Sequence, residues 1–325
     1  MNQNNIRELA ASFQRSRILL SSVELDIFTN IEDSGTTDKQ VADKLHLDER
    51  ACERLLNALA AMGFLTKQNG KFFNTSESFT FLSKKGIEFM GSLMHLNHLW
   101  KTWSNLTQVV QTGKSAHPAE INARGDDWLT AFITAMHERA KKQAPQQLAN
   151  IDLSGIRSVL DVGGGSGAFS MEFVSRKPEI EATVFDLPAV MPVTRQFIEK
   201  EGFSGKLKVH AGDYTTDELP QGFDLVFLSA VIHSNSLKTN RDLVIKCFNS
   251  LNRNGKVIIQ DWIMSNDRTR PLPGAVFAIN MLVGTEGGDC FTEQEVREML
   301  STAGFKGISR MEFESGLSQM TAQKI

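Results

Sequence analysis

Apolar side chains in the first third of the chain recur at the spacing of one face of an α-helix. Thr37 or Asp38 is suited to cap one short helix and Asp48 the next, with a tight turn at His46–Leu47 between them. The expected helices are Leu9–Leu20, Val23–Ile31, Gln40–Leu45 and Ala51–Met62.

A hairpin pattern follows these helices, because Phe64–Lys67 and Lys71–Asn74 are expected as strands around a turn at Gln68–Gly70. Two closely joined helices followed by a hairpin predict a winged helix, a shape that many DNA-binding proteins use. The second helix, however, opens with Asp48-Glu49-Arg50 and is not basic where it would meet phosphate. Its charge favours a structural or dimerising role over DNA binding.

Residues 84–150 continue as helices rich in large apolar side chains, with a polar loop expected at Gly113–Gly125. From Ile151 onwards, short β-rich runs alternate with helical stretches. This alternation predicts a parallel sheet with helices on both faces, ending in an antiparallel hairpin. The expected strands are Ser158–Val162, Ala182–Phe185, Leu207–His210, Leu225–Leu228, Val257–Asp261, Gly307–Phe313 and Ser318–Lys324. The expected helices are Ala168–Lys177, Ala189–Lys200, Arg241–Leu251 and Thr292–Ala303.

The composition of the chain argues against several classes of protein. In 325 residues, 35 Lys and Arg stand against 38 Asp and Glu, and a net charge of −3 indicates neither nucleic acid nor an anionic membrane as partner. No apolar run approaches the length of a membrane span, and the first residues lack the pattern of a signal peptide. Cys52, Cys247 and Cys290 are too few and too scattered for a disulfide framework, and no histidine spacing predicts a metal site. We therefore expect a soluble, cytoplasmic protein without a metal.

The strongest chemical signal is a buried strand that runs into a glycine-rich turn and opens a helix, within residues 158–170. Glycines at 163, 165 and 167 let the backbone approach a ligand closely, as in nucleotide-binding loops. The pattern Gly163-x-Gly165-x-x-Ala168, with Asp186 at the end of the next strand, also fits a nicotinamide site. Taken alone, the loop leaves the nucleotide open.

Three further features favour a methyltransferase. Asp161 precedes the first glycine, where a carboxylate can face the ammonium group of a bound amino acid. Asp213 follows the third strand, where it can accept a hydrogen bond from an adenine amino group. The nucleotide-binding half also lies at the end of the chain, with no evident catalytic domain after it.

With these features, the chain resembles the class I S-adenosylmethionine-dependent small-molecule O-methyltransferases that carry an N-terminal winged-helix dimerisation domain. The resemblance rests on residues 160–167, Phe185-Asp-Leu-Pro188 and Gly212-Asp-Tyr214, and on residues 60–65 and 73–76 in the winged helix. It implies an α/β fold, in which a Rossmann-like doubly wound methyltransferase domain follows a mostly α winged-helix domain. It also implies S-adenosylmethionine as cofactor and a homodimer formed through residues 1–110.

The resemblance implies three parts: a dimerisation domain at 1–83, a helical connecting region that lines the substrate pocket at 84–150, and an S-adenosylmethionine-binding domain at 151–325. The cofactor residues that it implies are Asp161, Gly163, Gly165, Asp186, Leu187, Asp213, Tyr214 and Ser229. The residues that it implies around a flat acceptor are Phe132, Met136, Met281 and Cys290, the last as an inert pocket-lining thiol or as a reactive one.

The same resemblance places the general base at His233, just after the fourth strand, and an orienting carboxylate at Asp261, which ends the fifth. The chemistry is reasonable, because an imidazole of pKa about 6.5 can take the proton of a phenol whose pKa is about 10. The chain departs from the family pattern after the base, where Ser234 and Asn235 replace the frequent Asp and Trp. It departs again at Cys290, which stands where the family has a glutamate.

The resulting hypothesis is methyl transfer from S-adenosylmethionine to a hydroxyl, most simply a phenolic one, of a small aromatic molecule. Three alternatives stay open: a methyltransferase fold with a carbon or nitrogen acceptor or with lost activity, a nicotinamide-dependent oxidoreductase, and a winged-helix regulator.

Overall fold

We analysed a computed structural model of the chain, which describes residues 1–115 and 126–325 and, for residues 126 and 127, only the backbone. The described chain divides into two compact units, Met1–Lys101 and Thr102–Ile325. Part of the polar loop expected at 113–125 therefore lies outside the described residues.

The first unit combines helices with a small antiparallel sheet of strand order β1-β3-β2. Its helices are α1 (Gln3–Ala11), α2 (Phe13–Glu24), η1 (Phe28–Asn30), α3 (Asp38–Leu45), α4 (Glu49–Ala61), α5 (Ser76–Leu82) and most of α6 (Leu93–Trp103). Its strands are β1 (Thr36–Thr37), β2 (Leu65–Gln68) and β3 (Lys71–Asn74). The fold matches the expected winged helix, with α3 and α4 as the joined helices and β2–β3 as the hairpin.

Local capping explains where these helices begin. The Thr37 side chain accepts a hydrogen bond from the Gln40 amide, and the Asp48 side chain accepts one from the Ala51 amide. His46, in the left-handed conformation, makes the turn between α3 and α4. The expected helix at 23–31 is wrong, since α2 ends at Glu24 and the chain turns before the short η1.

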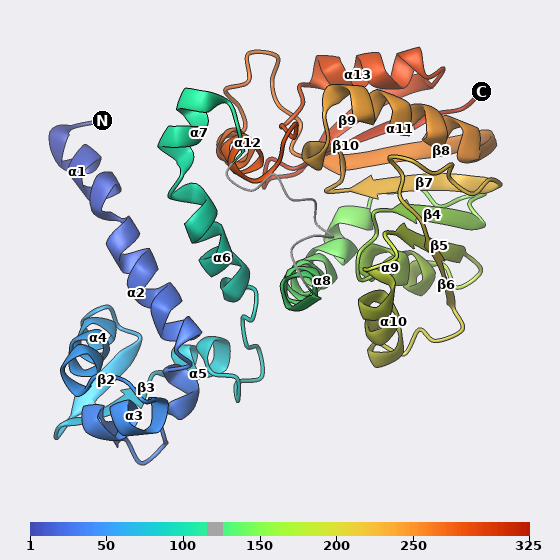
Figure 1. Cartoon of the computed structure of the whole chain (residues 1–325). Coiled ribbons are helices and arrows are strands. Elements are labelled where there is room, and N and C mark those ends of the chain that lie inside the picture. Colours follow the sequence, from blue (N-terminus) through green and yellow to red (C-terminus); the bar gives the residue numbers. More distant parts are fainter. Residues whose placement is uncertain (116–125) are drawn as a thin grey trace. The chain divides into compact units, whose positions relative to one another are not determined.

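The second unit is built on a seven-stranded sheet of order β6-β5-β4-β7-β8-β10-β9 (Figure 1). All neighbouring strands are parallel except β10, which is antiparallel to β8 and β9. The strands are β4 (Ser158–Val162), β5 (Glu181–Asp186), β6 (Leu207–Ala211), β7 (Phe223–Ser229), β8 (Leu251–Asp261), β9 (Lys306–Glu312) and β10 (Ser318–Gln323). The helices are α7 (Leu106–Thr112), α8 (Asp126–Leu148), α9 (Ala168–Arg176), α10 (Met191–Lys200), η3 (Ile232–Ser234), α11 (Leu237–Ser250), α12 (Leu272–Gly284) and α13 (Glu293–Thr302). This confirms the predicted doubly wound α/β class.

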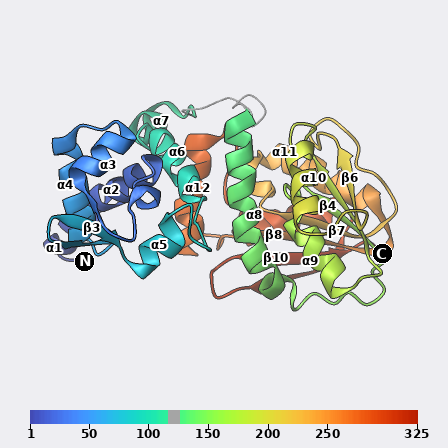
Figure 2. The same cartoon turned by 90° about the horizontal axis from the view of Figure 1, so that it is seen from below.

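Side chains alternate between the two faces of this sheet, as the pleat requires. On one face, Val159, Val184 and Phe227 pack under α8, α9 and α10. On the other, Leu160 and Val226 pack under α11 and α13. Figure 1 shows the two groups of helices on opposite sides of the sheet, and in Figure 2, seen from below, α8, α9 and α10 lie in front of the strands. Both faces are therefore buried, which explains the almost continuous apolar runs of the central strands.

Two helices of this unit differ from expectation. α11 begins at Leu237, because the Ser236 side chain caps it by accepting from the Thr239 amide, and Leu251 already belongs to β8. α12 was not expected at all. Its sequence is apolar on nearly every side and lacks the polar stripe that marks a surface helix.

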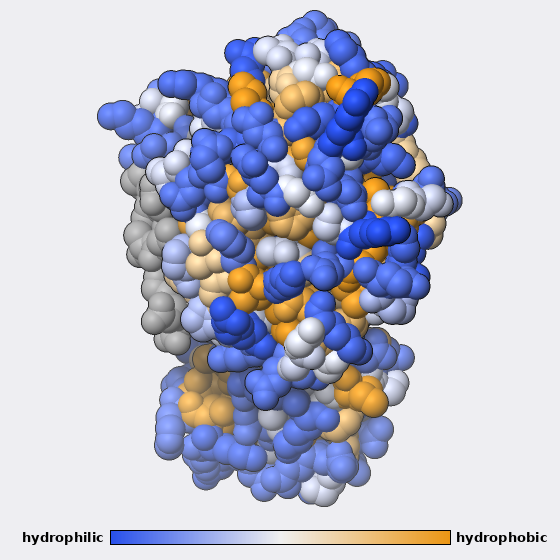
Figure 3. Space-filling model, turned by 90° about the vertical axis from the view of Figure 1, so that its right-hand side faces the viewer, coloured by the Kyte–Doolittle hydropathy of each residue, from blue (hydrophilic) through white to orange (hydrophobic). Residues whose placement is uncertain are grey.

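The outer surface is largely hydrophilic where it is seen in Figure 3, with hydrophobic side chains in small separate groups. Among the described residues, no helix has both the length and the apolar character needed to cross a membrane.

Candidate active site

The expected cofactor and catalytic residues lie at or just after the carboxyl ends of β4, β5, β6, β7 and β8, which meet along one edge of the sheet. Ligands of open parallel sheets bind at this edge, because the loops there rise from a rigid scaffold. The residues come from segments that lie far apart in sequence.

The glycine loop after β4 has the conformation that its sequence requires. Gly163 and Gly165 have φ angles of +67° and +54°, in the left-handed region where other side chains are strained. A Cβ atom on Gly163 would also lie 2.8 Å from a methyl group of Val231, in the segment after β7. The loop is thus held close to the chain that leads to His233.

Asp186, at the end of β5, is tied to this loop. One of its carboxylate oxygens accepts from the Gly165 amide at 2.8 Å and the other from the Leu187 amide at 2.7 Å. Burial raises the pKa of Asp186 to about 6, although these two hydrogen bonds act in the opposite direction. The amide of Leu187, another expected cofactor residue, is thereby fixed as well.

Asp161 lies beneath the glycine loop, where its carboxylate accepts from the Ser170 hydroxyl at 2.8 Å. Burial raises the pKa of Asp161 to about 7, and the nearby charge of Asp186 adds to the effect. Neither carboxylate has an ion pair among the described residues. A ligand with ammonium and sulfonium groups fits this environment, because it would bring positive charge to the loop.

Asp213 and Tyr214 follow β6. One carboxylate oxygen of Asp213 accepts from both the amide and the hydroxyl of Thr215, so the side chain stabilises its own turn. The Tyr214 hydroxyl donates to the Asn235 side chain at 3.2 Å. Tyr214 therefore connects the loop after β6 with the segment that carries His233.

His233 and Asp261 form a close pair, as the resemblance implied. The Nδ1 atom of His233 lies 2.9 Å from each carboxylate oxygen of Asp261, and the two side chains are only 11% and 2% exposed. The Trp262 amide also donates to the Oδ1 atom of Asp261 at 2.8 Å and helps to fix the carboxylate. A carboxylate at Nδ1 favours the tautomer with its proton there, which leaves the lone pair of Nε2 free to accept a proton.

The turn that carries His233 is held by contacts that the sequence analysis missed. The Asn240 side chain donates to the Ile232 carbonyl at 2.8 Å and accepts from the Asn235 side chain at 3.0 Å. The Asp289 amide donates to the His233 carbonyl at 2.9 Å. Asn235, where the family often has Trp, is thus a structural link in this chain.

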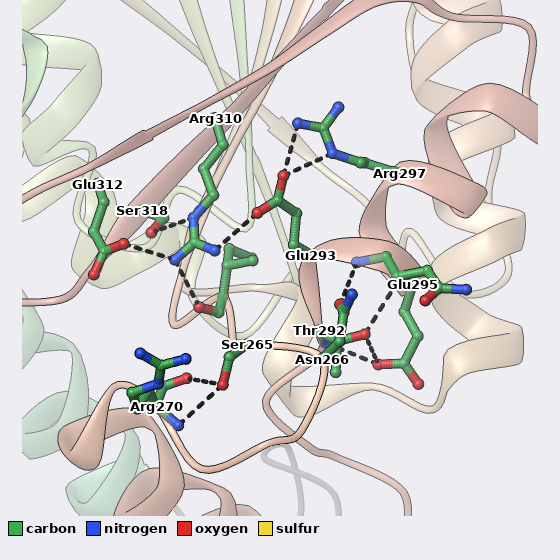
Figure 4. A network of polar contacts seen from close by, with 12 residues as sticks. Ser265, Asn266, Arg270, Thr292, Glu293, Glu295, Arg297, Arg310, Glu312 and Ser318 are labelled. Atoms are coloured by element: carbon green, nitrogen blue, oxygen red, sulfur yellow. Dashed lines mark hydrogen bonds and ion pairs between the residues drawn. The ribbon is translucent and has the colours of Figure 1, made fainter.

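Arg310 lies within a network of polar contacts, which Figure 4 shows together with Glu293, Glu312 and Ser318. Its guanidinium pairs with Glu293 at 3.0 Å, donates to the Ile263 carbonyl at 3.1 Å and donates to the Ser318 hydroxyl at 3.2 Å. Ser318 lies opposite Asp261 in the pairing of β8 with β10. This network holds the end of β8 in place.

The expected acceptor residues lie on three segments. Phe132 and Met136 are four residues apart on α8, where Phe132 stacks on Trp128 with ring centroids 5.1 Å apart. Their neighbour His137 shares a hydrogen bond of 2.9 Å with Ser166 of the glycine loop. This bond brings their helix to the loop.

Met281 lies on α12, one turn after Phe277, whose ring meets the ring of His233 edge to face at 4.8 Å. Phe277 was missed by the sequence analysis, for the same reason that α12 was. Cys290 is buried, and burial together with the charge of Asp261 raises the pKa of its thiol. Asp289 beside it pairs with Arg268.

Ser229, at the end of β7, accepts a hydrogen bond of 2.9 Å from the Gln260 side chain.

Among the described residues, no group of His, Cys, Asp and Glu side chains could hold a metal ion.

Known proteins share this architecture. A family model described as an O-methyltransferase domain matches residues 103–306, and one described as an O-methyltransferase dimerisation domain matches residues 7–84. The chain is similar to 3-hydroxy-5-methyl-1-naphthoate 3-O-methyltransferase from Streptomyces sahachiroi, with 28% identity over 316 residues that cover 95% of this chain and 91% of the relative.

Two solved structures share the fold. PigF with SAH has a TM-score of 0.91 at 22% identity, with both chains covered to 100%. Human N-acetylserotonin methyltransferase in complex with SAM has a TM-score of 0.86 at 24% identity, with 100% of this chain and 98% of that chain covered.

Tyr214 is the only tyrosine of the chain, so its ionisation can be followed by ultraviolet absorbance. Burial raises its pKa to about 12, so we expect the native protein to form phenolate at a pH about 2 units higher than the denatured protein does. The folded state binds the proton more tightly, so its stability should be intact below a pH of about 10 and fall as the pH rises towards 12. Equal midpoints in native and denatured protein would contradict the burial, and Tyr214→Phe should remove the signal.

Proposed function

The chain belongs to the S-adenosylmethionine-dependent O-methyltransferase family, and we propose that it methylates a hydroxyl of a small aromatic molecule with His233 as the general base. The observation that carries the proposal is the His233–Asp261 pair, held beside the glycine loop at the carboxyl edge of the sheet. Membership of this family sets aside the oxidoreductase and the winged-helix regulator.

S-adenosylmethionine is the methyl donor, and when bound it supplies an electrophilic methyl group on a positively charged sulfur. Asp186 would hold the ribose hydroxyls, since its carboxylate lies beside the glycine loop, where it accepts from the Gly165 amide. Asp213 would accept from the adenine amino group, with Leu187 and Tyr214 beside the ring. Asp161, Gly163 and Gly165 would surround the methionine end.

His233 would remove the proton from the acceptor hydroxyl as its oxygen attacks the methyl group. Its Nε2 atom is the available base, because Nδ1 is held by Asp261. Once His233 is protonated, the carboxylate of Asp261 stabilises the imidazolium. Alignment of the two reactants contributes to the rate independently of this proton transfer.

The acceptor would lie between apolar walls. Phe132 and Met136 from α8 and Met281 from α12 are suited to a flat ring, because thioethers contact aromatic faces favourably. Phe277 adds an aromatic surface against His233 itself. Cys290 would be an inert wall, because its raised thiol pKa keeps it protonated and weakly nucleophilic.

The protein would act as a homodimer through its first unit. The dimerisation model covers residues 7–84, and α1 has no buried residue. Ile6, Leu9 and Phe13 are exposed by 55%, 66% and 52% and recur at helical spacing. Such a stripe of large apolar side chains is typical of an interface.

Asp186→Ala should weaken binding of S-adenosylhomocysteine, the demethylated product, by at least about tenfold, because hydrogen bonds to a charged carboxylate are lost. In the wild type, affinity should rise as the pH passes through about 6, since the ionised carboxylate is the stronger acceptor. Calorimetry at several pH values checks both, with the exposed Asp242→Ala as control. An unchanged affinity would refute the role of Asp186.

His233→Ala should leave S-adenosylhomocysteine binding unchanged and lower turnover of a phenolic acceptor by about 10²–10⁴-fold. Rising pH should partly restore the rate, because the acceptor then ionises in solution. Asp261→Asn should cause a smaller loss through a misplaced tautomer.

Mass spectrometry with a labelled methyl group and a panel of phenols measures these rates and locates the methyl. Wild-type turnover in His233→Ala, or label found only on carbon or nitrogen, would overturn the proposed base or the proposed acceptor.

Light scattering should give the mass of a dimer for the intact protein at micromolar concentration, and a lower mass for Ile6→Glu combined with Leu9→Glu. The charges would have to be buried in the apolar interface, which is costly. Glu8→Lys, on the same helix, is the matched control. A monomeric wild type would end the proposed role of this surface.

A further inference from the structure

Three glutamine side chains form a chain of hydrogen bonds inside the second unit. Gln147 at the end of α8, Gln260 on β8 and Gln319 on β10 are 7%, 2% and 2% exposed. They lie on the face of the sheet covered by α8, and the chain ends at Ser229, which is the partner of Gln260 in the pairing of β7 with β8. Buried amides in such a chain have fixed orientations, because each unpaired polar atom would be costly.

The orientations of the Gln319 and Gln260 side-chain amides follow from the Gln147 end of the hydrogen-bond chain. The backbone carbonyl of Gln147 is only an acceptor, and the Nε2 atom of Gln319 donates to it at 2.9 Å. The same Nε2 donates to the Oε1 atom of Gln260 at 2.8 Å. The oxygen of the Gln260 amide therefore faces Gln319, and its nitrogen faces the other way.

The nitrogen of Gln260 uses both of its hydrogens. One is donated to the Gln147 side-chain oxygen at 3.0 Å and the other to the Ser229 hydroxyl oxygen at 2.9 Å. Gln260 has no acceptor on this side. The Ser229 hydroxyl must therefore accept from Gln260 and point its own proton elsewhere, as a hydrogen-bond donor.

The strand order indicates which part of the cofactor lies near this donor. Asp186 ends β5 and Asp213 follows β6, so the proposed ribose and adenine contacts lie on one side of β4. Ser229 ends β7, on the other side of β4, where the methionine end would extend. The ammonium of that end only donates hydrogen bonds and its sulfonium is cationic, so its carboxylate is the group that accepts.

We propose that the Gln147–Gln319–Gln260 chain sets the polarity of Ser229, so that its hydroxyl donates to the carboxylate of the methionine end of S-adenosylmethionine. Ser229 is then a binding residue, and Gln260 is a positioning residue that acts through it. The inference rests on the proposed placement of the cofactor along the strand edge.

Reversing the polarity of position 260 tests the inference. Gln260→Glu preserves size, but when ionised the introduced carboxyl group only accepts, so the Ser229 proton should turn inward to it. Ser229→Ala removes the donor without reversing anything. Calorimetry at neutral and alkaline pH would compare S-adenosylhomocysteine with its analogue in which the carboxylate is replaced by hydrogen.

Ser229→Ala should weaken binding of S-adenosylhomocysteine by about tenfold, equivalent to about 1.4 kcal/mol. Gln260→Glu should match it at alkaline pH and weaken binding less at neutral pH, where burial favours the protonated form of the introduced group. The double variant should be no weaker than either single one, because both remove the same hydrogen bond. The analogue without carboxylate should bind equally well to all.

Gln323→Glu is the matched control. Gln323 lies on the same strand as Gln319 and also donates to a backbone carbonyl, that of Asn254, but it takes no part in the chain. The affinity of the Gln323→Glu variant for both ligands should stay at the wild-type value. If Gln260→Glu does not fold, Gln319→Met replaces it, because the Gln260 amide is then free to rotate and a smaller loss is expected.

Equal weakening of both ligands, additive effects in the double variant, or full affinity in Ser229→Ala would overturn the inference. These outcomes leave the proposed cofactor placement intact as long as Asp186→Ala weakens binding. If Asp186→Ala has no effect either, the placement itself is wrong.

Discussion

The parallel pairing of β7 with β8 is the constraint on which the candidate site depends. Their register places Ser229 opposite Gln260, so the chain leaving β7 passes directly over the end of β8. His233 then reaches Asp261 within one short turn, and the imidazole is held by a carboxylate that is itself almost fully buried. A shift of the register by one residue would turn Asp261 to the opposite face and break the pair.

The edge that carries the site is rich in carboxylates and poor in fixed positive charge. Asp161 and Asp186 are held in surroundings that raise the pKa of both, and His233 is the partner of Asp261. Unpaired buried carboxylates are unfavourable by themselves. A cationic ligand above the glycine loop would offset the cost of burying these carboxylates. The site therefore suits a sulfonium cofactor.

The departures from the family pattern are compensated by contacts of this chain. Asn235 cannot pack as a tryptophan would, but it connects Tyr214 to Asn240, whose side chain holds the Ile232 carbonyl. At Cys290 the negative charge of the family glutamate is absent, so among the described residues Asp261 is the one side chain that holds the His233 imidazole by a hydrogen bond. The uncharged side-chain amides of Asn235 and Asn240 thus hold the turn around His233 in this protein.

Local patterns in the sequence were sufficient for the class of fold, the glycine loop and the positions of the strands, although β8 begins at Leu251, six residues before the expected start. Alternation and helical periodicity are properties of neighbouring residues, and the glycines at 163 and 165 are required by backbone conformations that depend on little else. The pairing of His233 with Asp261 was expected only through the family resemblance, because 28 residues separate them in sequence. α12 and its contact between Phe277 and His233 were missed, since a helix whose sequence is apolar on nearly every side has no periodic signal.

The glutamine chain shows most clearly what only the tertiary structure decided. Gln147, Gln260 and Gln319 carry no local signature, and each is an ordinary polar residue in its own segment. They meet because β8 lies between β7 and β10 and because α8 packs over that face. The sequence determined which backbone conformations and which chemical groups were available. The order of the strands decided which of those groups came within hydrogen-bond distance, because such contacts depend on positions in space that no stretch of neighbouring residues contains.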